Sequence, residues 1–325
     1  MAEIRLDVTE TPSQSTRPLA LSLLKLARPH QWSKSIFVLA GPIYYMADPG
    51  REDSKQVIIA AFIASAAFAL ASSACYVIND LRDVERDRQH PRKCKRPIAA
   101  GQVSMTQALV FASALLIAAA GTILLVAPPA RGWLALSVGV YVVNVMLYSF
   151  IFKRVVITDV MGLSVGFVIR VLGGCAAAGI EPSSWLLNCT FFLAMFLSFG
   201  KRLGERRTMG DNASAARQVQ ETYTDELLRM AVVVTAVAAL LTYSGYVQDR
   251  GESFTRGFNL LWLTVLPATY CMFRCIVLLE RGTYDDPTEL ASKDRPFQLG
   301  VIVFGTFTGS LTLWPEIFLG VASGP

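Results

Sequence analysis

Long apolar runs with almost no charge dominate the sequence and restrict what it can fold into. Each main run has roughly 20 residues, the length of α-helix that crosses a hydrocarbon core about 30 Å thick. The pattern predicts an all-α integral membrane protein with nine transmembrane helices. The expected spans are residues 32–47, 57–78, 106–127, 132–152, 155–180, 183–200, 230–247, 259–279 and 299–320. The first is short and carries Pro42.

Composition supports this assignment. Charged residues make up 17% of the chain, whereas they are about 25% of a typical soluble domain. We therefore expect one membrane domain, residues 21–325, after a flexible N-terminal segment, residues 1–20. Residues 19–27 are apolar but contain Lys25 and lack a small-residue cleavage site, so they predict an interfacial helix and not a signal peptide.

The basic residues predict the orientation. With nine spans the connections alternate between two faces, and one set holds most of the basic residues, among them Arg82, Arg86, Arg88, Arg92, Lys93, Lys95, Arg96, Lys153, Arg154, Lys201, Arg202, Arg206 and Arg207. The positive-inside rule places that set in the cytoplasm. The net charge of +5 is thus mostly a signal of topology, and we expect no nucleic acid partner.

Cysteine and histidine indicate no further chemistry. The six cysteines form no CxxC pair, and all except Cys94 lie in expected spans, where they act as small apolar residues. Cys94 lies in an expected cytoplasmic loop, so we expect no disulfide. The two histidines are too few and too far apart for a zinc site.

Four polar residues follow the second expected span at helical spacing. Asn79, Asp83 and Asp87 are four residues apart and Asp80 is three before Asp83, so all four line one helix face. Mg²⁺ prefers oxygen ligands and commonly bridges carboxylates to substrate phosphates. We interpret these residues as a site for a Mg²⁺-diphosphate substrate. The alternative is a solvated helix end with internal ion pairs.

Basic residues lie at the same predicted membrane level. Lys34 opens the first span, Lys153 and Arg154 end the fourth, and Lys201 and Arg202 end the sixth. Each alone is typical of a residue that anchors a helix to anionic lipid. As a group beside acidic residues, they favour binding of several phosphates.

Two charges lie inside the fifth expected span. Arg170 is eleven residues after Asp159, about 16 Å deeper at 1.5 Å per residue. A guanidinium at that depth is costly, so we favour a polar substrate cavity over an interhelical ion pair. Tyr76 and Tyr148 are further candidates for its lining, although each alone is more often a packing residue. Glu205 either orients the basic pair that ends the sixth span or has a structural role.

These motifs resemble the UbiA-type intramembrane prenyltransferase superfamily. They are the RPxQWxK sequence at residues 28–34 and NDxxDxxxD from Asn79. Ordinary members carry a second aspartate-rich motif after the sixth span, where this chain has GKRxxE at residues 200–205. That replacement, with HPRK at 90–93, RPIAAG at 96–101, Tyr223-Thr224 and DRP at 294–296, is similar to the decaprenyl-phosphate phosphoribosyltransferase branch. The resemblance covers nearly the whole chain from Leu21.

The resemblance implies a UbiA-like bundle with a cytoplasm-facing active-site cavity and a defined donor. The branch transfers a 5-phosphoribosyl group from phosphoribosyl diphosphate. Asp80, Asp83 and Asp87 would hold Mg²⁺ on the donor's diphosphate, and Asn79 would contact donor or metal. The basic pair at residues 201–202 would receive a phosphate, such as the ribose 5-phosphate.

The implied acceptor is a polyprenyl (decaprenyl) phosphate. Its phosphate monoester has a second pKa near 6, so it is mostly dianionic at neutral pH and needs no general base. Its oxygen would attack ribose C1 with inversion, and diphosphate would leave. The candidates for binding its phosphate are Lys34, Lys153, Arg154 and Arg170.

The resemblance further implies a multi-pass protein of the bacterial cytoplasmic (inner) membrane, with a part in cell wall biosynthesis as a source of arabinan precursors. It leaves homo-oligomerisation and acceptor length open. Two alternatives remain. One is an ordinary aromatic prenyltransferase with a prenyl diphosphate donor, which the missing second acidic motif disfavours. The other is a lipid-phosphate transporter, which would need polar residues toward both membrane faces.

Overall fold

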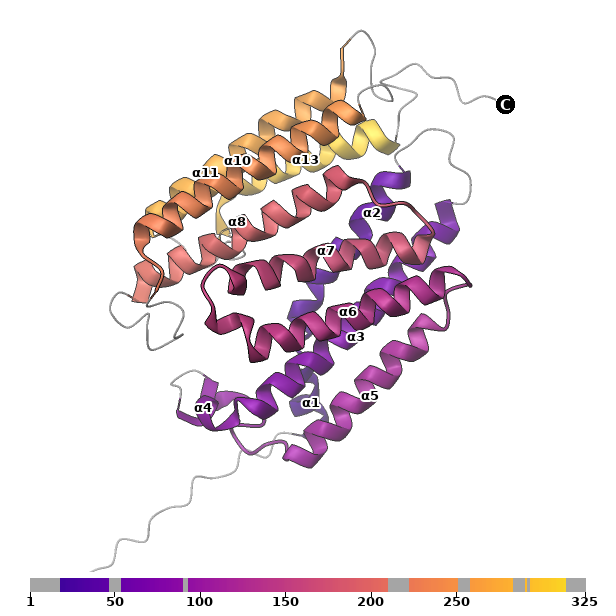
Figure 1. The fold of residues 1–325 in the computed structure, drawn as a ribbon, viewed down its shortest axis with the longest axis vertical. Helices are drawn as coiled ribbons and strands as arrows, with labels where there is room; N and C mark the ends of the chain where they lie inside the picture. Colours follow the sequence, from indigo (N-terminus) through magenta and orange to yellow (C-terminus); the bar gives the residue numbers. More distant parts are fainter. Residues whose placement is uncertain are drawn as a thin grey trace, which may run out of the picture. The chain divides into compact units, whose positions relative to one another are not determined.

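The computed structural model describes residues 18–46, 54–89, 93–209, 222–250, 258–282, 290 and 293–313, which form α-helices and short 3-10 helices (Figure 1). The chain divides into two compact units, Met1–Ser33 with Leu70–Ala118 and Lys34–Ala69 with Ala119–Pro325. Most of the N-terminal segment expected to be flexible, residues 1–17, lies outside the described residues.

The first unit is built around the end of one long helix. It contains α1 (Leu19–Ala27), the C-terminal part of α3 (Ser54–Arg82), α4 (Val84–Gln89), η2 (Lys93–Lys95) and most of α5 (Met105–Ile123). Leu26 of α1, Val77 of α3 and Ala112 of α5 meet in its apolar core. This core fixes the end of α3 and the polar residues that follow it.

The second unit is a series of packed helices. α6 (Ala130–Phe150) packs on α7 (Thr158–Ala178), and α7 also packs on α8 (Ser184–Met209) and α2 (Ile36–Met46), as Figure 1 shows for the central helices. A Cβ at Gly174 of α7 would overlap the carbonyl oxygen of Val38 in α2. Glycine there allows the two backbones to approach closely, as is common between membrane helices.

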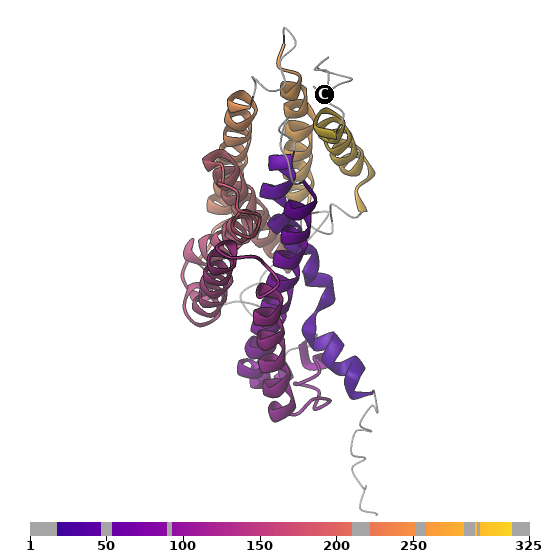
Figure 2. The same ribbon diagram turned by 90° about the vertical axis from the view of Figure 1, so that its right-hand side faces the viewer.

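The remaining helices of the second unit continue from α8. α10 (Asp225–Asp249) packs on α8 and on α11 (Val265–Glu280), which follows η7 (Leu260–Thr264) and packs on α13 (Arg295–Leu313). Figure 2 shows α13, in yellow, alongside the orange helices. Buried apolar residues of α8, α10 and α11, among them Phe196, Val232 and Cys275, form the core between them.

Seven of the described helices are long and apolar enough to cross a membrane. They correspond to the second through eighth expected spans. The first expected span is 3-10 helix η1 (Pro29–Ser35) followed by α2, which has only 11 residues and contains Pro42. The last is described only as far as Leu313, whereas the apolar run continues to residue 320. The described helices therefore support a multi-pass membrane protein.

Candidate active site

The helical spacing of the polar residues after the second span is present in the first unit. The helix is interrupted at Asp83, yet Asp83 N–H donates to Asn79 O at 3.0 Å and Asp87 N–H donates to Asp83 O at 2.8 Å. These are i to i−4 bonds of an α-helix, so one turn leads from α3 into α4. Asp80 and Asp87 are buried, and Asn79 and Asp83 are half-buried.

Two arginines hold the buried carboxylates. Arg96 Nη1 lies 2.9 Å from Asp80 Oδ1 and 2.7 Å from Asp87 Oδ2, so a single nitrogen bridges the two. Arg28 Nη2 donates to the same Asp80 oxygen at 2.6 Å. Both arginine side chains remain about a quarter exposed, whereas that of Asp80 is 2% exposed. We call Asp80, Asp83 and Asp87, with Arg28 and Arg96, the aspartate cluster.

The RPxQWxK sequence brings Arg28 to this cluster. Arg28 ends α1 in the left-handed conformation, with φ 54° and ψ 61°. Its guanidinium lies 5.1 Å from the ring centroid of Tyr76, within cation–π range. Trp32 Nε1 donates to Ser73 Oγ at 2.9 Å, and Ser73 Oγ donates to Ala27 O at 2.8 Å. The segment is therefore fastened to α3 on both sides of Arg28.

Asp80 and Asp87 could bind a magnesium ion whose remaining ligands come from a substrate phosphate. Across the described parts of the chain, no three His, Cys, Asp or Glu side chains are grouped to hold a metal ion. Mg²⁺, however, is usually bound by one or two carboxylates together with substrate phosphates. Asp80 and Asp87 already share one cationic nitrogen of Arg96, so the pair accepts positive charge at that point.

A second polar network lies in the second unit, between α7, α8 and the start of α10. Arg202 Nε donates to Asp159 Oδ2 at 3.0 Å, and Arg202 Nη1 donates to Glu205 Oε2 at 3.4 Å. Tyr223 OH donates to Asp159 Oδ1 at 2.6 Å. We call Asp159, Arg202, Glu205 and Tyr223 the arginine cluster.

The arginine cluster is almost completely buried. The side chains of Arg202 and Asp159 are 2% and 0% exposed. Arg202 Nη2 is buried and has no hydrogen-bond partner among the described residues. Burial, together with the hydrogen bond to Asp159, raises the pKa of the Tyr223 phenol, so Tyr223 is a permanent hydrogen-bond donor at neutral pH.

Arg170 lies elsewhere in the second unit, at 4% exposure. Arg170 Nη2 donates to Tyr141 OH at 2.7 Å, and its guanidinium lies 4.6 Å and 5.5 Å from the ring centroids of Tyr141 and Phe167. Asp159 therefore pairs with Arg202 and not with Arg170. The hydroxyl and aromatic faces provide the polar surroundings that a guanidinium inside a membrane helix requires.

The predicted site residues are divided between the two units. The first unit holds Tyr76, Asn79, Asp80, Asp83 and Asp87, and the second holds Lys34, Tyr148, Lys153, Arg154, Asp159, Arg170, Lys201, Arg202 and Glu205. Lys34, Tyr148, Lys153, Lys201 and Glu205 are half-buried, and Arg154 is exposed. Glu205 pairs with Arg202, so it contacts one residue of the basic pair that ends the sixth expected span.

Four polar side chains in these networks were not selected as candidates from the residues alone: Arg28, Arg96, Tyr141 and Tyr223. Tyr141 is three residues before Asn144 and seven before Tyr148 on α6, so helical spacing could have identified it. Arg28 and Arg96 lie in the RPxQWxK and RPIAAG sequences. No periodic signal marks Tyr223.

The chain is similar to known proteins over most of its length. The model of the UbiA prenyltransferase family matches residues 35–302. The decaprenyl-phosphate phosphoribosyltransferase of Corynebacterium glutamicum is 33% identical over 286 residues, which are 88% of this chain and 85% of that protein. The protein of the same name from Mycobacterium tuberculosis is 32% identical over 294 residues, 90% of this chain and 93% of the relative.

Solved structures agree on the fold. A UbiA homolog from Archaeoglobus fulgidus bound to GPP and Mg²⁺ superimposes with a TM-score of 0.65 at 16% identity, covering 90% of this chain and 99% of that one. The seven helices able to cross a membrane, the family match and the relatives together indicate a multi-pass membrane transferase. The chain belongs to the UbiA prenyltransferase family, and it is an enzyme.

Proposed function

We propose that this enzyme transfers the 5-phosphoribosyl group of phosphoribosyl diphosphate to a polyprenyl phosphate, decaprenyl phosphate in the relatives' names, and releases diphosphate. The observation that carries the proposal is the buried Arg202 Nη2, a charged donor with no partner among the described residues. A donor substrate with phosphate at both ends requires fixed cations as well as a metal. GKRxxE at residues 200–205 supplies them where ordinary relatives have acidic residues.

The diphosphate of the donor is assigned to the aspartate cluster. Asp80, Asp83 and Asp87 would hold Mg²⁺, although the three carboxylates are not grouped around one metal position in the described structure and would have to come together when the substrate binds. Bound Mg²⁺ would neutralise charge on the departing diphosphate. Asn79 contacts the donor or the metal. Arg28 and Arg96, each about a quarter exposed beside Asp80, would pair with oxygens of the diphosphate. Tyr76 supports Arg28 through its ring.

The ribose 5-phosphate of the donor is assigned to Lys201 and Arg202. Asp159 and Glu205 fix the guanidinium of Arg202 from two sides and leave Nη2 to receive the anion. Tyr148 lies close enough to interact electrostatically with Arg202 and contributes to the lining. A charge-assisted hydrogen bond of this kind is about twice as strong as a neutral one.

The acceptor phosphate is assigned to Lys34, Lys153, Arg154 and Arg170. Their main effect is to overcome the repulsion between two polyanionic substrates. The acceptor is dianionic at neutral pH, so the chain needs no general base. Its oxygen attacks ribose C1 from the face opposite to the diphosphate, with inversion of that carbon.

The topology belongs to the same proposal. One catalytic domain, residues 21–325, crosses the bacterial cytoplasmic membrane nine times, with the active-site cavity facing the cytoplasm. Seven described helices meet the length and composition of a span, and the basic connections favour this orientation. The product would then serve as a precursor of cell-wall arabinan.

A single reaction tests the function. Purified protein is incubated with Mg²⁺, phosphoribosyl diphosphate and a polyprenyl phosphate, and diphosphate release and lipid mass are measured together. We expect release with a gain of one phosphoribosyl unit on the lipid. Transfer of a prenyl group from prenyl diphosphate to an aromatic acid, with no phosphoribosyl transfer, would overturn the proposal.

A further inference from the structure

Ile157 has a strained backbone. It lies between η3 (Phe152–Arg154) and α7, with φ 68° and ψ −45°. A β-branched residue at positive φ is a true outlier because its side chain collides with its own backbone. Such residues persist only where their surroundings hold them, and they cluster at functional sites.

The hydroxyl of Tyr223 holds this residue. Ile157 N–H donates to Tyr223 OH at 2.7 Å, while the same hydroxyl donates to Asp159 Oδ1 at 2.6 Å. Tyr223 is 1% exposed and its ring packs edge-on against Phe199, with centroids 6.3 Å apart. A buried, fully used hydroxyl therefore joins the strained backbone to the arginine cluster.

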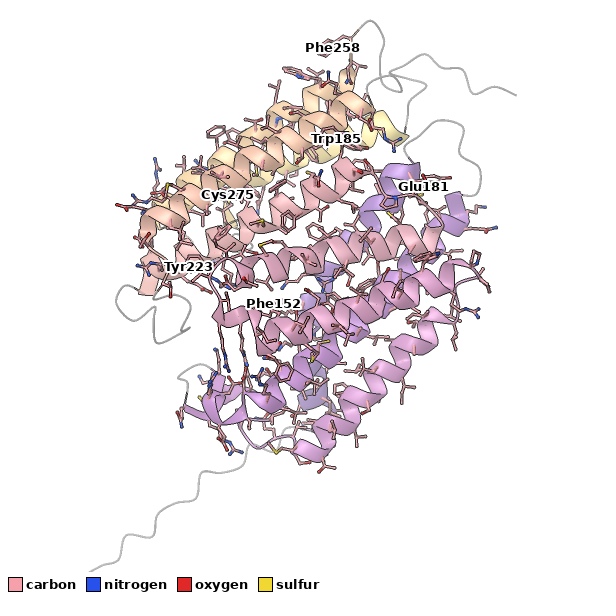
Figure 3. All side chains as sticks on the ribbon, in the orientation of Figure 1. Phe152, Glu181, Trp185, Tyr223, Phe258 and Cys275 are labelled. Atoms are coloured by element: carbon pink, nitrogen blue, oxygen red, sulfur yellow. The ribbon has the colours of Figure 1, made fainter. Side chains whose placement is uncertain are left out.

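The other end of the turn is also anchored. A Cβ added to Gly162 of α7 would lie 2.9 Å from Phe152 Cδ2, so the ring of Phe152 occupies the space that this glycine leaves. Figure 3 labels Phe152 and Tyr223 at the same end of the second unit's helices. Between these two anchors lie Lys153 and Arg154.

We propose, on the basis of the function proposed above, that Tyr223 is a positioning residue: it clamps the backbone of Ile157 so that Lys153 and Arg154 are held in the conformation that binds the acceptor phosphate. The turn that carries Lys153 and Arg154 is then already ordered before the substrate binds. Cations held in place in this way bind an anion more tightly, because binding does not include the entropy cost of ordering them.

Tyr223→Phe removes the clamp and keeps the ring. Strain of the size expected at such a residue corresponds to roughly tenfold in an equilibrium constant. We therefore expect the KM for polyprenyl phosphate to rise about tenfold. The KM for phosphoribosyl diphosphate should rise less, because Tyr223 affects the donor site only through its hydrogen bond to Asp159. An equal rise in both KM values, or a fall in kcat alone, would overturn the assignment.

A rescue variant separates positioning from general stability. Glycine adopts positive φ without strain, so Ile157→Gly added to Tyr223→Phe should restore most of the lost acceptor affinity. If Tyr223→Phe alone does not fold, the double variant should fold. A double variant as impaired as the single one shows that Tyr223 does not act through Ile157.

The matched control is Tyr243→Phe on α10. Tyr243 is also a buried tyrosine whose hydroxyl hydrogen-bonds to another element, Thr264 at 2.5 Å. Its loss should lower the melting temperature to a similar extent and leave both KM values unchanged. If the KM for polyprenyl phosphate also rises in this control, the effect of Tyr223→Phe is explained by loss of stability and the proposal is overturned.

Limited trypsin digestion tests whether the hydrogen bond between Tyr223 and Ile157 orders the turn, without measuring enzyme activity. Cleavage after Lys153 or Arg154, identified by mass spectrometry, should be slow in the wild type and several-fold faster in Tyr223→Phe. If the wild type transfers no phosphoribosyl group but the variant is cut faster, the clamp stands and only its proposed function fails. Equal cleavage rates would overturn the clamp itself.

Discussion

The aspartate cluster and the arginine cluster are both networks of buried ion pairs, but they differ in how firmly the cations are held. In the aspartate cluster the carboxylates are buried and the arginines are about a quarter exposed. In the arginine cluster the cation is buried together with its main partner, at 2% and 0% exposure. Displacing the arginines of the first network would expose them to water, whereas displacing Arg202 in the second would leave a charge buried.

This difference follows from the cost of desolvation. A buried pair adds little net stability, but removal of one partner leaves an uncompensated charge and is strongly destabilising. Arg28 and Arg96 are exposed enough to move toward water. Arg202 is buried and has no such route, so in the proposed function it would be a fixed donor to the substrate. Variants that replace Asp by Asn at matched positions test the comparison.

The largest expected effect is at Asp159. Asp159→Asn leaves the buried guanidinium of Arg202 with one carboxylate partner among the described residues, Glu205 at 3.4 Å, so the free energy of unfolding should fall by about 3–5 kcal/mol. Thermal unfolding in detergent measures this. A melting temperature equal to that of the wild type would show that Arg202 is not held more firmly than the arginines of the aspartate cluster.

The next effect is on catalysis at the aspartate cluster. Asp83→Asn should lower Mg²⁺-dependent turnover by about a hundredfold or more, because charge on the diphosphate is no longer neutralised. Asp83 is half-buried, so the melting temperature should change little. Normal turnover at saturating Mg²⁺ in this variant would remove Asp83 from the metal assignment.

Lys201→Ala sharpens the assignment of the two phosphates. Loss of one charge-assisted contact should raise the KM for phosphoribosyl diphosphate by about tenfold and affect the KM for the lipid phosphate less. Steady-state kinetics with each substrate varied in turn provides the measurement. The opposite order would exchange the two proposed phosphate sites.

The smallest effect is expected at an exposed pair. Arg206 Nε lies 2.7 Å from Asp225 Oδ1, with side chains 28% and 47% exposed. Asp225→Asn should lower the free energy of unfolding by less than about 1 kcal/mol, and added salt should reduce the difference. An effect as large as that of Asp159→Asn would mean that burial does not determine the ranking.

The sequence predicted those parts of the site that depend on periodicity. The spacing of Asn79, Asp83 and Asp87 requires a helix, and the backbone continues helically through that stretch. The seven described helices that are long and apolar enough to cross a membrane were predictable for the same reason. The first expected span was not, because Pro29–Ser35 forms a 3-10 helix and only 11 residues of α2 follow.

Contacts between segments that are distant in the chain could not be predicted from the sequence. Arg96 pairs with Asp80, which lies 16 residues earlier in the chain, and no periodic pattern predicts this contact. Asp159 forms an ion pair between two helices, the kind of contact that was given as the alternative to a substrate cavity, and its partner Arg202 could not be identified from spacing within one span. The conformation of Ile157 opposes its local preference and depends on Tyr223, 66 residues further along the chain. Only tertiary structure supplies such partners.

The attachment of Arg28 to Asp80 determines where the chain can be shortened. The family match begins at residue 35, yet Arg28 and Trp32 lie before it and contact α3 in the first unit. A protein truncated to residues 35–302 would retain seven expected transmembrane helices whole and most of the first, but only residues 299–302 of the last. It would lose Arg28, one of the two arginines that pair with the buried Asp80, so the segment before residue 35 belongs with the packed first unit.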